Sequence, residues 1–477
     1  MNKHIRIAAA VLIAALVAVP MFAARGAADF SHLVVLGDSY GAGFESGSLN
    51  ERHQPWSWGA VLARQVGYDI CPATAVATDD CFAVPLVSYP GLGNELTLTS
   101  LIPGPVIAPA PGSAAPRMIN FARPYNNLSI PGATVGALLT LTGAETPTAG
   151  EPTAVSMARF ILRGLGTPVQ QAIAQRPSFI ALWIGGNDYL NVMFSGTPAT
   201  ITPAADFKVR YEALLDALIA GAPNAGMVVG NLPSGIPPYL TLVPPVLVDP
   251  TTRQPILIGG QPVFYMVDSG NGTQAPITAT TLIPLQTRDK IAQGYGLPAL
   301  LRNIPPFSLL PHVGEPLSPN DVITADEISQ VFTRIAEYNT IINQAAAARN
   351  IPVADVAGLF SRVSAPGGIS LGPISVSSAP VTGGFYSFDF FHLTDLGYLL
   401  FGNEFIKAIN EGYDTEIPLA SITQLFANNG AFFPDANAAA QLSFIGTNNG
   451  ITTEGLKQIQ SFWQKPTILR RSRAVGH

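Results

Sequence analysis

The sequence predicts an α/β fold built on a parallel sheet. Three short aliphatic runs, Leu33–Leu36, Ser178–Ile184 and Met227–Leu232, alternate with segments of helical spacing. Strands that are apolar on both faces and alternate with helices are typical of parallel βαβ units covered by helices on each side. The functional loops of such sheets follow the carboxyl ends of the strands. Two polar motifs, Gly37–Ser39 and Gly185–Asp188, lie directly after the first and second runs.

Helical spacing predicts further helices at residues 56–67, 154–175 (interrupted near 164–167) and 203–220. Thr324–Glu327 has the form of a capping box, so a long helix is expected to begin there and to end near residue 350. A short strand is expected at 352–356, followed by a helix at 393–410 with Thr394 as its N-terminal cap. Residues 85–153 are rich in Pro, Gly, Ser and Thr and are interpreted as a loop that ends where the predicted helix 154–175 begins.

The chain is long enough for more than one domain, with 477 residues of which 48% are apolar and 12% charged. This composition excludes a disordered protein, which would be rich in charge and poor in apolar residues. Residues 28–416 are interpreted as the main domain, and 417–477 as a C-terminal helical extension. Residues 233–319 do not fit the βα pattern and are interpreted as an insertion of loops and hairpins. It is either a structural decoration or a cap or lid over the functional site.

The N-terminus has the layout of a secretory signal peptide. Lys3 and Arg6 precede an uncharged run, Ile7–Ala24, which ends in small residues. We expect a signal over residues 1–27, cleaved within 23–28, and therefore export to the periplasm, the cell surface or the medium. An uncleaved membrane anchor is the alternative, because the run just reaches the length that spans a bilayer.

The two cysteines fit an exported protein. Cys71 and Cys81 enclose a short loop, and in an oxidising compartment a disulfide between them is expected. Free thiols or a metal pair are the alternatives, but two cysteines with no nearby His make a poor zinc site, so no metal is expected.

The charge distribution argues against a nucleic-acid partner. The net charge is −6, and the only clustered positive residues are at the tail: Arg470, Arg471 and Arg473. Phosphate binding needs concentrated Lys and Arg.

Two of the six histidines have an Asp three residues upstream. The other four lie near the chain ends or in loops with no informative partner spacing: His4, His477, His53 and His312. His32, with Asp29, enters the first strand at its amino end, the wrong end for a site, and is interpreted as a surface residue. His392, with Asp389, precedes a helix, where the upstream carboxylate can turn back to orient the imidazole.

The turns of the sequence contain a candidate serine nucleophile and candidate oxyanion donors. Ser39 lies at a strand-to-loop turn, where its hydroxyl and its N–H are available, and Asp38 is interpreted as a turn acceptor. Gly132 offers an unshielded N–H and Asn187 a side-chain amide, both suited to holding an oxyanion. Ordinary turn residues are the alternative for each of them.

Taken in order, four motifs resemble the blocks of the SGNH (GDSL) hydrolase superfamily. They are G-D-S at Gly37–Ser39, P-G-A-T at Pro131–Thr134, G-G-N-D at Gly185–Asp188 and D-x-x-H at Asp389–His392. The resemblance covers about residues 30–412. It implies a three-layer α/β/α sandwich with a parallel, flavodoxin-like sheet.

The resemblance also implies a role for each matching residue. Ser39 would be the nucleophile, His392 its base and Asp389 the orienting acid. Ser39, Gly132 and Asn187 would form the oxyanion hole. No cofactor and no metal are implied.

Two features depart from the family pattern. Tyr40 stands where the first block usually has Leu, a position interpreted as packing. The long gap between Asp188 and Asp389 reflects the insertion and weakens substrate inference from relatives.

The expected function is therefore a secreted serine hydrolase of carboxylic esters, a lipase or esterase, acting on a small-molecule or lipid ester with transient contact to a lipid surface. A polysaccharide O-acetyl esterase or an acyltransferase on the same residues is the alternative within enzymes. An inert surface-binding protein on this scaffold is the alternative from another class. The oligomeric state is not specified by any pattern.

Overall fold

The computed structural model describes residues 26–100, 106–249, 252, 254–270, 272–372 and 374–428. The predicted signal peptide up to residue 25 and the C-terminal extension from residue 429 lie outside the described residues. The first twelve residues of the predicted extension, 417–428, are described and include the short helix α13 (Ile422–Asn428).

A four-stranded parallel sheet forms the centre of the molecule. Its order is β1 (Leu33–Gly37), β4 (Phe179–Trp183), β5 (Gly226–Gly230) and β10 (Val353–Ala354). Every residue of β1, β4 and β5 is buried, which explains the unbroken aliphatic runs in the sequence. The predicted α/β fold with a parallel sheet is confirmed.

Residues 126–130 extend the sheet beyond β1. They run parallel to β1 and exchange backbone hydrogen bonds with it: Val35 N–H to Asn126 O, Leu128 N–H to Val35 O, and Ile130 N–H to Gly37 O. In chain order this segment comes between β1 and β4, so the arrangement reads 2-1-3-4-5, the order of flavodoxin-like sheets. The Pro131–Thr134 motif therefore begins at the same sheet edge as Ser39.

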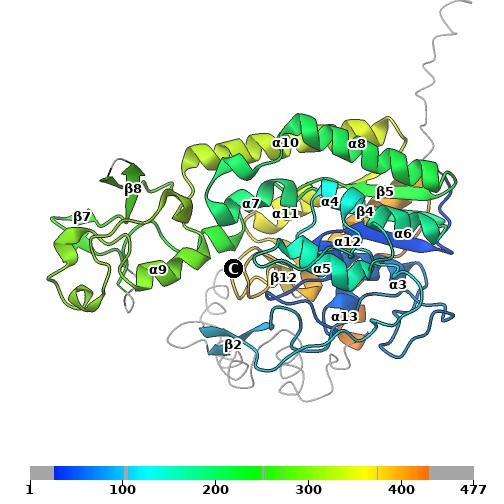
Figure 1. The fold of residues 1–477 in the computed structure, drawn as a ribbon, viewed down its shortest axis with the longest axis horizontal. Coiled ribbons are helices and arrows are strands. Elements are labelled where there is room, and N and C mark those ends of the chain that lie inside the picture. Colours follow the sequence, from blue (N-terminus) through cyan, green and yellow to red (C-terminus); the bar gives the residue numbers. More distant parts are fainter. Residues whose placement is uncertain are drawn as a thin grey trace, which may run out of the picture.

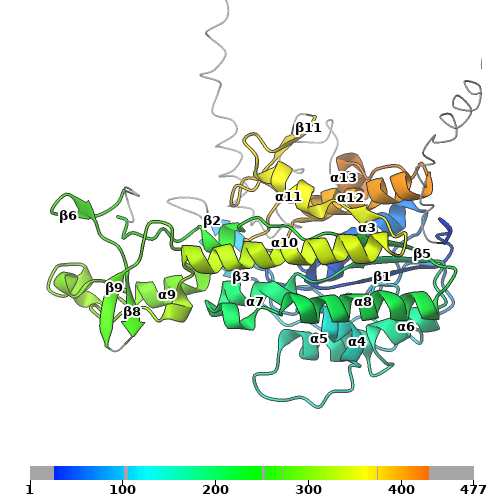
Figure 2. The same ribbon diagram turned by 90° about the horizontal axis from the view of Figure 1, so that it is seen from above.

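Helices cover both faces of the sheet (Figure 1, Figure 2). On one face α8 (Ala204–Gly221) packs with three helices, α4 (Val135–Thr140), α6 (Pro168–Ala174) and α10 (Ala325–Ala347). On the other face α12 packs with α3, α11 and α13. The bounds of these three are Asp395–Tyr413 for α12, Trp58–Gln65 for α3 and Val356–Ser364 for α11.

Local sequence signals place several helix ends as predicted. Thr324 and Glu327 form the expected capping box at the start of α10. The Thr394 hydroxyl accepts from the Gly397 N–H and caps α12. The predicted helix at 154–175 is two helices, α5 (Thr153–Leu162) and α6, broken where expected.

The stretch predicted as loop contains regular structure. The strands β2 (Leu96–Ser100) and β3 (Val106–Pro109) pair as an antiparallel hairpin, and α4 follows the Pro131–Thr134 motif. A second hairpin, β11 (Ile369–Leu371) with β12 (Ile374–Val376), precedes the Asp389–His392 motif. These strands are short and only partly buried, so they carry no long apolar run that would distinguish them from loop.

The insertion has an apolar core of its own. It contains β6 (Leu257–Ile258), β7 (Gln261–Pro262), β8 (Met266–Gly270), β9 (Thr273–Pro276) and α9 (Arg288–Ala292). Eleven buried residues of segment 243–322 form a cluster separate from the main core, with Tyr265, Leu301 and Leu317 among them. Figures 1 and 2 show this part projecting from one end of the sheet.

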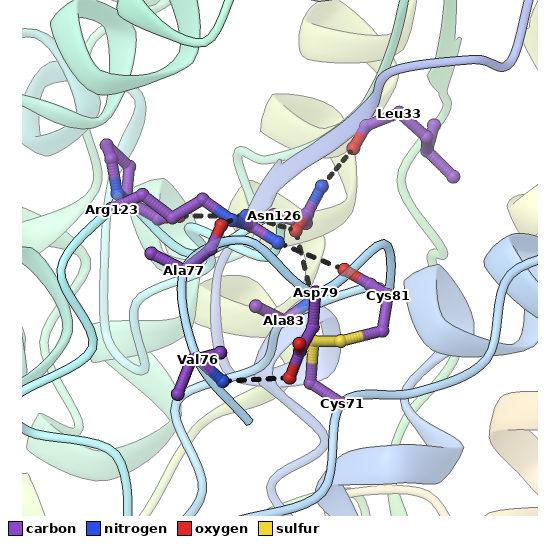
Figure 3. Close-up of a disulfide and its surroundings, with 10 residues drawn as sticks. Leu33, Cys71, Val76, Ala77, Asp79, Cys81, Ala83, Arg123 and Asn126 are labelled. Atoms are coloured by element: carbon purple, nitrogen blue, oxygen red, sulfur yellow. Dashed lines mark hydrogen bonds between the residues drawn. A yellow bond between two sulfur atoms is a disulfide. The ribbon is translucent and has the colours of Figure 1, made fainter. Parts of the chain in front are cut away.

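The predicted disulfide between Cys71 and Cys81 is present (Figure 3). The guanidinium of Arg123 donates to the Cys81 carbonyl and to the side chain of Asn126. Asn126 in turn donates to the Leu33 carbonyl and accepts from the Ala83 N–H. The disulfide loop is thereby joined to the start of β1.

In the described part of the chain, no helix has both the length and the apolar character that crossing a bilayer requires.

Candidate active site

Ser39 lies where β1 ends and the short helix α2 (Ser39–Ala42) begins. The carboxylate of Asp38 accepts from the Tyr40 N–H at 3.0 Å and caps this helix, as the sequence predicted for a turn acceptor. Burial raises the pKa of Asp38 to about 8. The sharp turn places the Ser39 hydroxyl at the carboxyl edge of the sheet, in the wall of a pocket.

The turn Asp389–His392 folds the acid back onto the histidine. Phe390 has a φ of 61°, a left-handed conformation that costs energy for a residue with a Cβ. The turn is held because Asp389 Oδ1 accepts from the N–H groups of Phe391 and His392, at 2.9 and 2.8 Å. Asp389 and His392 are separated by two residues because one turn of the chain, closed by these hydrogen bonds, lies between them.

Asp389, His392 and Ser39 form a continuous hydrogen-bonded chain. Asp389 Oδ2 lies 2.8 Å from His392 Nδ1, and His392 Nε2 lies 3.0 Å from Ser39 Oγ. With the proton on Nδ1, the carboxylate accepts from the ring, and Nε2 is left as an acceptor for the serine hydroxyl. The structure brings these three sequence-predicted residues together, although Ser39 and His392 are 353 positions apart in the chain.

The Asp389 carboxylate has two further donors. The Gly47 N–H donates to Oδ2 at 2.8 Å, and the Ser387 hydroxyl donates to Oδ1 at 3.1 Å. Burial by itself would raise the pKa of Asp389, but the adjacent His392 and the backbone N–H groups outweigh it and lower the pKa to about 2. The group is therefore an anion throughout the physiological pH range. Gly47 and Ser387 were not singled out by any sequence motif.

Aromatic side chains enclose the imidazole. The centroid of the Phe44 ring lies 4.7 Å from that of the His392 ring, and the centroid of the Tyr40 ring lies 5.6 Å from it. The buried Tyr40 stacks on Trp183 and donates its hydroxyl to the Phe391 carbonyl at 2.8 Å. Tyr40 is thus a packing residue, as predicted, and it also ties the turn of Ser39 to the turn of His392.

The two other candidate oxyanion donors lie beside Ser39. Gly132 has a φ of +82°, and a Cβ there would come within 3.1 Å of the Ala154 N atom at the start of α5, so the position requires glycine. Among the described residues, neither the Ser39 N–H nor the Gly132 N–H has a protein acceptor. Asn187 begins α7 (Asn187–Ser195), directly after β4. All three line the same pocket.

The Gly185–Asp188 motif holds the Gly132 loop in place. Asn187 Nδ2 donates to the Ala133 carbonyl at 3.0 Å, and its second contact, to Asp38 Oδ2, is longer at 3.4 Å. The buried Asp188 accepts from the Val135 N–H at 2.9 Å, and burial raises its pKa to about 6. Asn187 Nδ2 therefore has one hydrogen bond of ordinary length and one long, weak one to Asp38.

A family model of GDSL-like lipases and acylhydrolases matches residues 33–405. The chain belongs to the GDSL-like lipase/acylhydrolase family. The match spans all four motifs and most of the chain, and the members of this family are ester hydrolases. The resemblance drawn from the motifs is thereby confirmed, as is the three-layer α/β fold that it implied.

Solved structures of three bacterial enzymes are similar to this GDSL-like hydrolase. A lipase/acylhydrolase from Enterococcus faecalis has 13% identity and a TM-score of 0.32, and covers 82% of this chain and 100% of its own. A phospholipase A1 from Streptomyces albidoflavus has 15% identity and a TM-score of 0.32, with the same coverage. An extracellular lipase from Streptomyces rimosus has 13% identity and a TM-score of 0.30, and covers 80% and 98%. Comparison with curated protein sequences gives no significant match.

The pocket of the GDSL-like hydrolase at Ser39 has a volume of about 990 Å³. Its walls come from segments 39–44, 131–155, 187–210 and 391–392. Apolar side chains make up much of the wall, among them Ala137, Leu139, Leu141, Val155 and Phe194. Among the described residues of this wall, Arg210 is the one Lys or Arg, and its carboxylate neighbour Asp206 lies 3.9 Å away.

The insertion of the GDSL-like hydrolase lies beside this pocket. It reaches the site through the Tyr239 N–H, which donates to the Phe390 carbonyl, and through Gln286, which donates to the Phe194 carbonyl. No described residue of 233–319 lines this pocket, but Pro233, Gly235 and Pro237 line a smaller cavity that Ser39 also lines. The role of the insertion as a cap or lid stays a prediction.

Two other histidines of the GDSL-like hydrolase differ from the sequence interpretation. His32 is half-buried, and not on the surface, because β1 begins directly after it. His53 is fully buried and contacts three carboxylates, although its loop showed no informative spacing. Glu95 and Asp395 come from distant segments, so no local motif could have indicated the whole set of partners.

Proposed function

We propose that this hydrolase cleaves carboxylic esters through an acyl-enzyme on Ser39. The observation that carries the proposal is the hydrogen-bonded chain from Asp389 through His392 to Ser39, at 2.8 and 3.0 Å, which ends in a pocket. A serine hydroxyl is a weak nucleophile unless a neighbouring base takes its proton. An oriented imidazole within hydrogen-bond distance supplies that base.

In the proposed mechanism, Ser39 Oγ attacks the ester carbonyl while His392 Nε2 takes its proton. Asp389 stabilises the resulting imidazolium and keeps the ring in the productive orientation. The carbonyl oxygen becomes an oxyanion, to which the N–H groups of Ser39 and Gly132 and the amide of Asn187 donate. His392 then protonates the leaving alcohol, and water attacks the acyl-enzyme by the same route.

Replacing Asn187 with Ala is expected to lower kcat about 10²–10³-fold, the usual loss for one oxyanion donor. KM should change less, because the donor acts on charge that develops in the transition state. Asn191→Ala is the matched control, since Asn191 also lines the pocket but lies one helical turn further along α7. Equal losses in both variants would assign the effect to general disturbance of the pocket.

The substrate class that fits the pocket is an ester with an extended apolar acyl group. The wall between α4 and α5 is largely aliphatic, and a volume of about 990 Å³ exceeds what an acetyl group needs. This supports a lipase or esterase over an acetyl esterase. Hydrolysis of nitrophenyl acetate, butyrate and palmitate tests the choice: a kcat/KM that is highest for acetate would refute an extended acyl site.

Filling the pocket should shift this preference. In Val155→Phe, a larger side chain from α5 enters the acyl site, and kcat/KM for the palmitate ester should fall about tenfold or more relative to the acetate ester. Val209→Phe is the control, because Val209 is 68% exposed on α8 and outside the pocket wall. A palmitate-to-acetate ratio that is the same in Val155→Phe and the wild type would place the acyl chain elsewhere.

We also propose that the enzyme is exported. A disulfide between Cys71 and Cys81 is typical of proteins that fold in oxidising compartments, and the N-terminal sequence has the layout of a signal peptide. N-terminal sequencing of the protein recovered from the medium or periplasm tests this, with a new N-terminus expected within residues 23–28.

A further inference from the structure

A second polar cluster lies buried behind the catalytic turn. His53 is its centre: Nδ1 lies 3.2 Å from Glu45 Oε2 and 3.1 Å from Asp395 Oδ1, and Nε2 lies 3.3 Å from Glu95 Oε2. The side chains of His53 and Glu95 are 0% exposed, that of Glu45 is 1% and that of Asp395 is 6%. No step of the proposed ester cleavage uses any of these four groups.

The cluster has more negative charge than its neighbours compensate. With all three carboxyls ionised and the imidazole protonated, the four groups sum to −2, and in the described chain no Lys or Arg forms an ion pair with them. The charge of Arg64 on α3 acts on Asp395 from outside the cluster, because its guanidinium is directed to the Pro55 carbonyl and the Trp56 ring. Charges buried this completely are found paired or bound to metal ions, because leaving water is costly.

Two carboxylate oxygens in the cluster also lack a hydrogen bond. Glu45 Oε2 and Glu95 Oε1 are buried and have no hydrogen-bond partner among the described residues. Glu45 Oε2 is 3.2 Å from His53 Nδ1, but that nitrogen has its hydrogen bond with Asp395 Oδ1. Glu45 therefore directs a carboxyl oxygen without a hydrogen bond at the point where the imidazole and Asp395 meet.

The spacing of the donor atoms suits one small cation. Ligand atoms of Glu45, His53 and Asp395 all lie within 4.8 Å of one another. Atoms bound to one ion at about 2.0–2.2 Å are themselves about 3.0–3.4 Å apart, and the two distances from Nδ1 are 3.1 and 3.2 Å. On the other side of the ring, Nε2 lies 3.3 Å from Glu95 Oε2 without a hydrogen bond, and Asn50 Nδ2 donates to the same oxygen at 3.1 Å. A carboxylate behind the imidazole is the usual partner of a metal-binding histidine.

We propose that Glu45, His53 and Asp395 bind one divalent transition-metal ion, with Glu95 orienting the imidazole from behind. A set of one imidazole nitrogen and two carboxylate oxygens suits Zn²⁺ or Mn²⁺ better than Ca²⁺ or Mg²⁺, which prefer oxygen ligands alone. This site goes beyond the proposed ester hydrolysis and does not depend on it.

The role of the ion follows from where its ligands lie in the chain. Glu45 is two residues before Gly47, whose N–H donates to Asp389. Asp395 is three residues after His392 and begins α12. One ion bound to both segments would join two parts of the site. It would connect the loop of Gly47, which supports Asp389, with α12, which follows His392. The ion is structural, and the expected effect of its loss is on stability.

Metal content and melting temperature test the site together. The full-length mature protein is purified without chelators, and its Zn and Mn contents are measured by mass spectrometry. A second portion is unfolded in guanidinium with EDTA, with the disulfide left intact, and refolded with or without Zn²⁺ or Mn²⁺. We expect about one equivalent of metal and a melting temperature that is several degrees lower after metal-free refolding and is restored by the ion.

Glu45→Gln separates this proposal from the main alternative, in which two bound protons compensate the charge. A glutamine amide resembles a protonated Glu45 in shape and charge, so with protons alone the variant would keep its melting temperature. With the ion, Glu45→Gln should lose both the metal and the metal-dependent stabilisation. Glu315→Gln is the matched control, because Glu315 pairs with His312 at the same distance of 3.2 Å but on the surface.

Two results on the wild type together would overturn the proposal: isolation without metal, and a melting temperature that responds to neither ion after refolding. This test remains decisive even if Glu45→Gln does not fold. Neither readout uses ester hydrolysis, so a failed metal site and a failed serine mechanism are distinguishable.

Discussion

The Ser39→Ala variant is expected to lose ester hydrolysis by on the order of 10⁴–10⁶ in kcat. The change removes the oxygen that His392 Nε2 activates at 3.0 Å and leaves the pocket and the oxyanion donors intact. Those donors can still assist attack by water, so a low residual rate above the uncatalysed one is expected. Steady-state hydrolysis of nitrophenyl butyrate by both proteins gives the comparison.

Ser156→Ala serves as the control, because Ser156 is a helix serine whose hydroxyl donates only to the Thr153 carbonyl. A fluorophosphonate probe should label the wild type and Ser156→Ala but not Ser39→Ala. If Ser39→Ala retained the label and the activity, another residue would be the nucleophile and the proposed mechanism would be wrong. An unlabelled and inactive wild type would instead indicate an inert scaffold.

The Asp389→Asn variant should lose about 10⁴-fold in kcat, the usual effect of removing the charge behind a catalytic histidine. The amide presents an N–H to His392 Nδ1, which favours the tautomer with the proton on Nε2, where it cannot accept from Ser39. The two N–H groups that donate to Oδ1 can keep an Asn in place, so the fold should survive. The measurement is kcat near neutral pH, with circular dichroism to verify folding.

Asp29→Asn is the matched control for Asp389→Asn, since Asp29 also stands three residues before a histidine but is exposed and accepts from the Ser31 N–H. Similar losses in both variants would contradict the proposed role of Asp389.

Acid stability offers a separate check on Asp389. The folded-state pKa of about 2 is below the value of about 3.9 for an unfolded Asp. The stabilisation from this carboxylate is therefore present above about pH 4 and is lost as the pH falls towards 2. In Asp389→Asn, the decline of the melting temperature over that interval should be shallower than in the wild type.

The central sheet and the position of Ser39 could be predicted because the information is local. Strands buried on both faces need unbroken apolar runs, and a parallel sheet collects the turns after those runs at one edge. Ser39 and Asn187 follow β1 and β4 in this way. The capping residues Thr324 and Thr394 are equally local, because each bonds to a group three residues away.

Features that depend on distant partners were not visible in the sequence. Gly47 supports Asp389 across 342 residues, and a backbone N–H leaves no trace in the residue type. The buried partners of His53 come from three separate segments, so the histidine looked like an ordinary loop residue. The start of α7 at Asn187 was missed for a different reason: the helix begins inside the motif, with no side-chain cap before it.

The way the insertion is joined to the sheet has a consequence for how the enzyme can be altered. Its entry and exit lie on either side of one segment, since Val243 pairs with Ile283, and the adjacent Leu282 pairs with Ile323. Chain ends held this close, with an apolar core of their own beyond them, are typical of a unit that can be exchanged between related chains. A short linker or a foreign domain can therefore take the place of residues 244–322, the whole segment that forms this separate core. The hydrolase could be fused to a surface-binding module at this position.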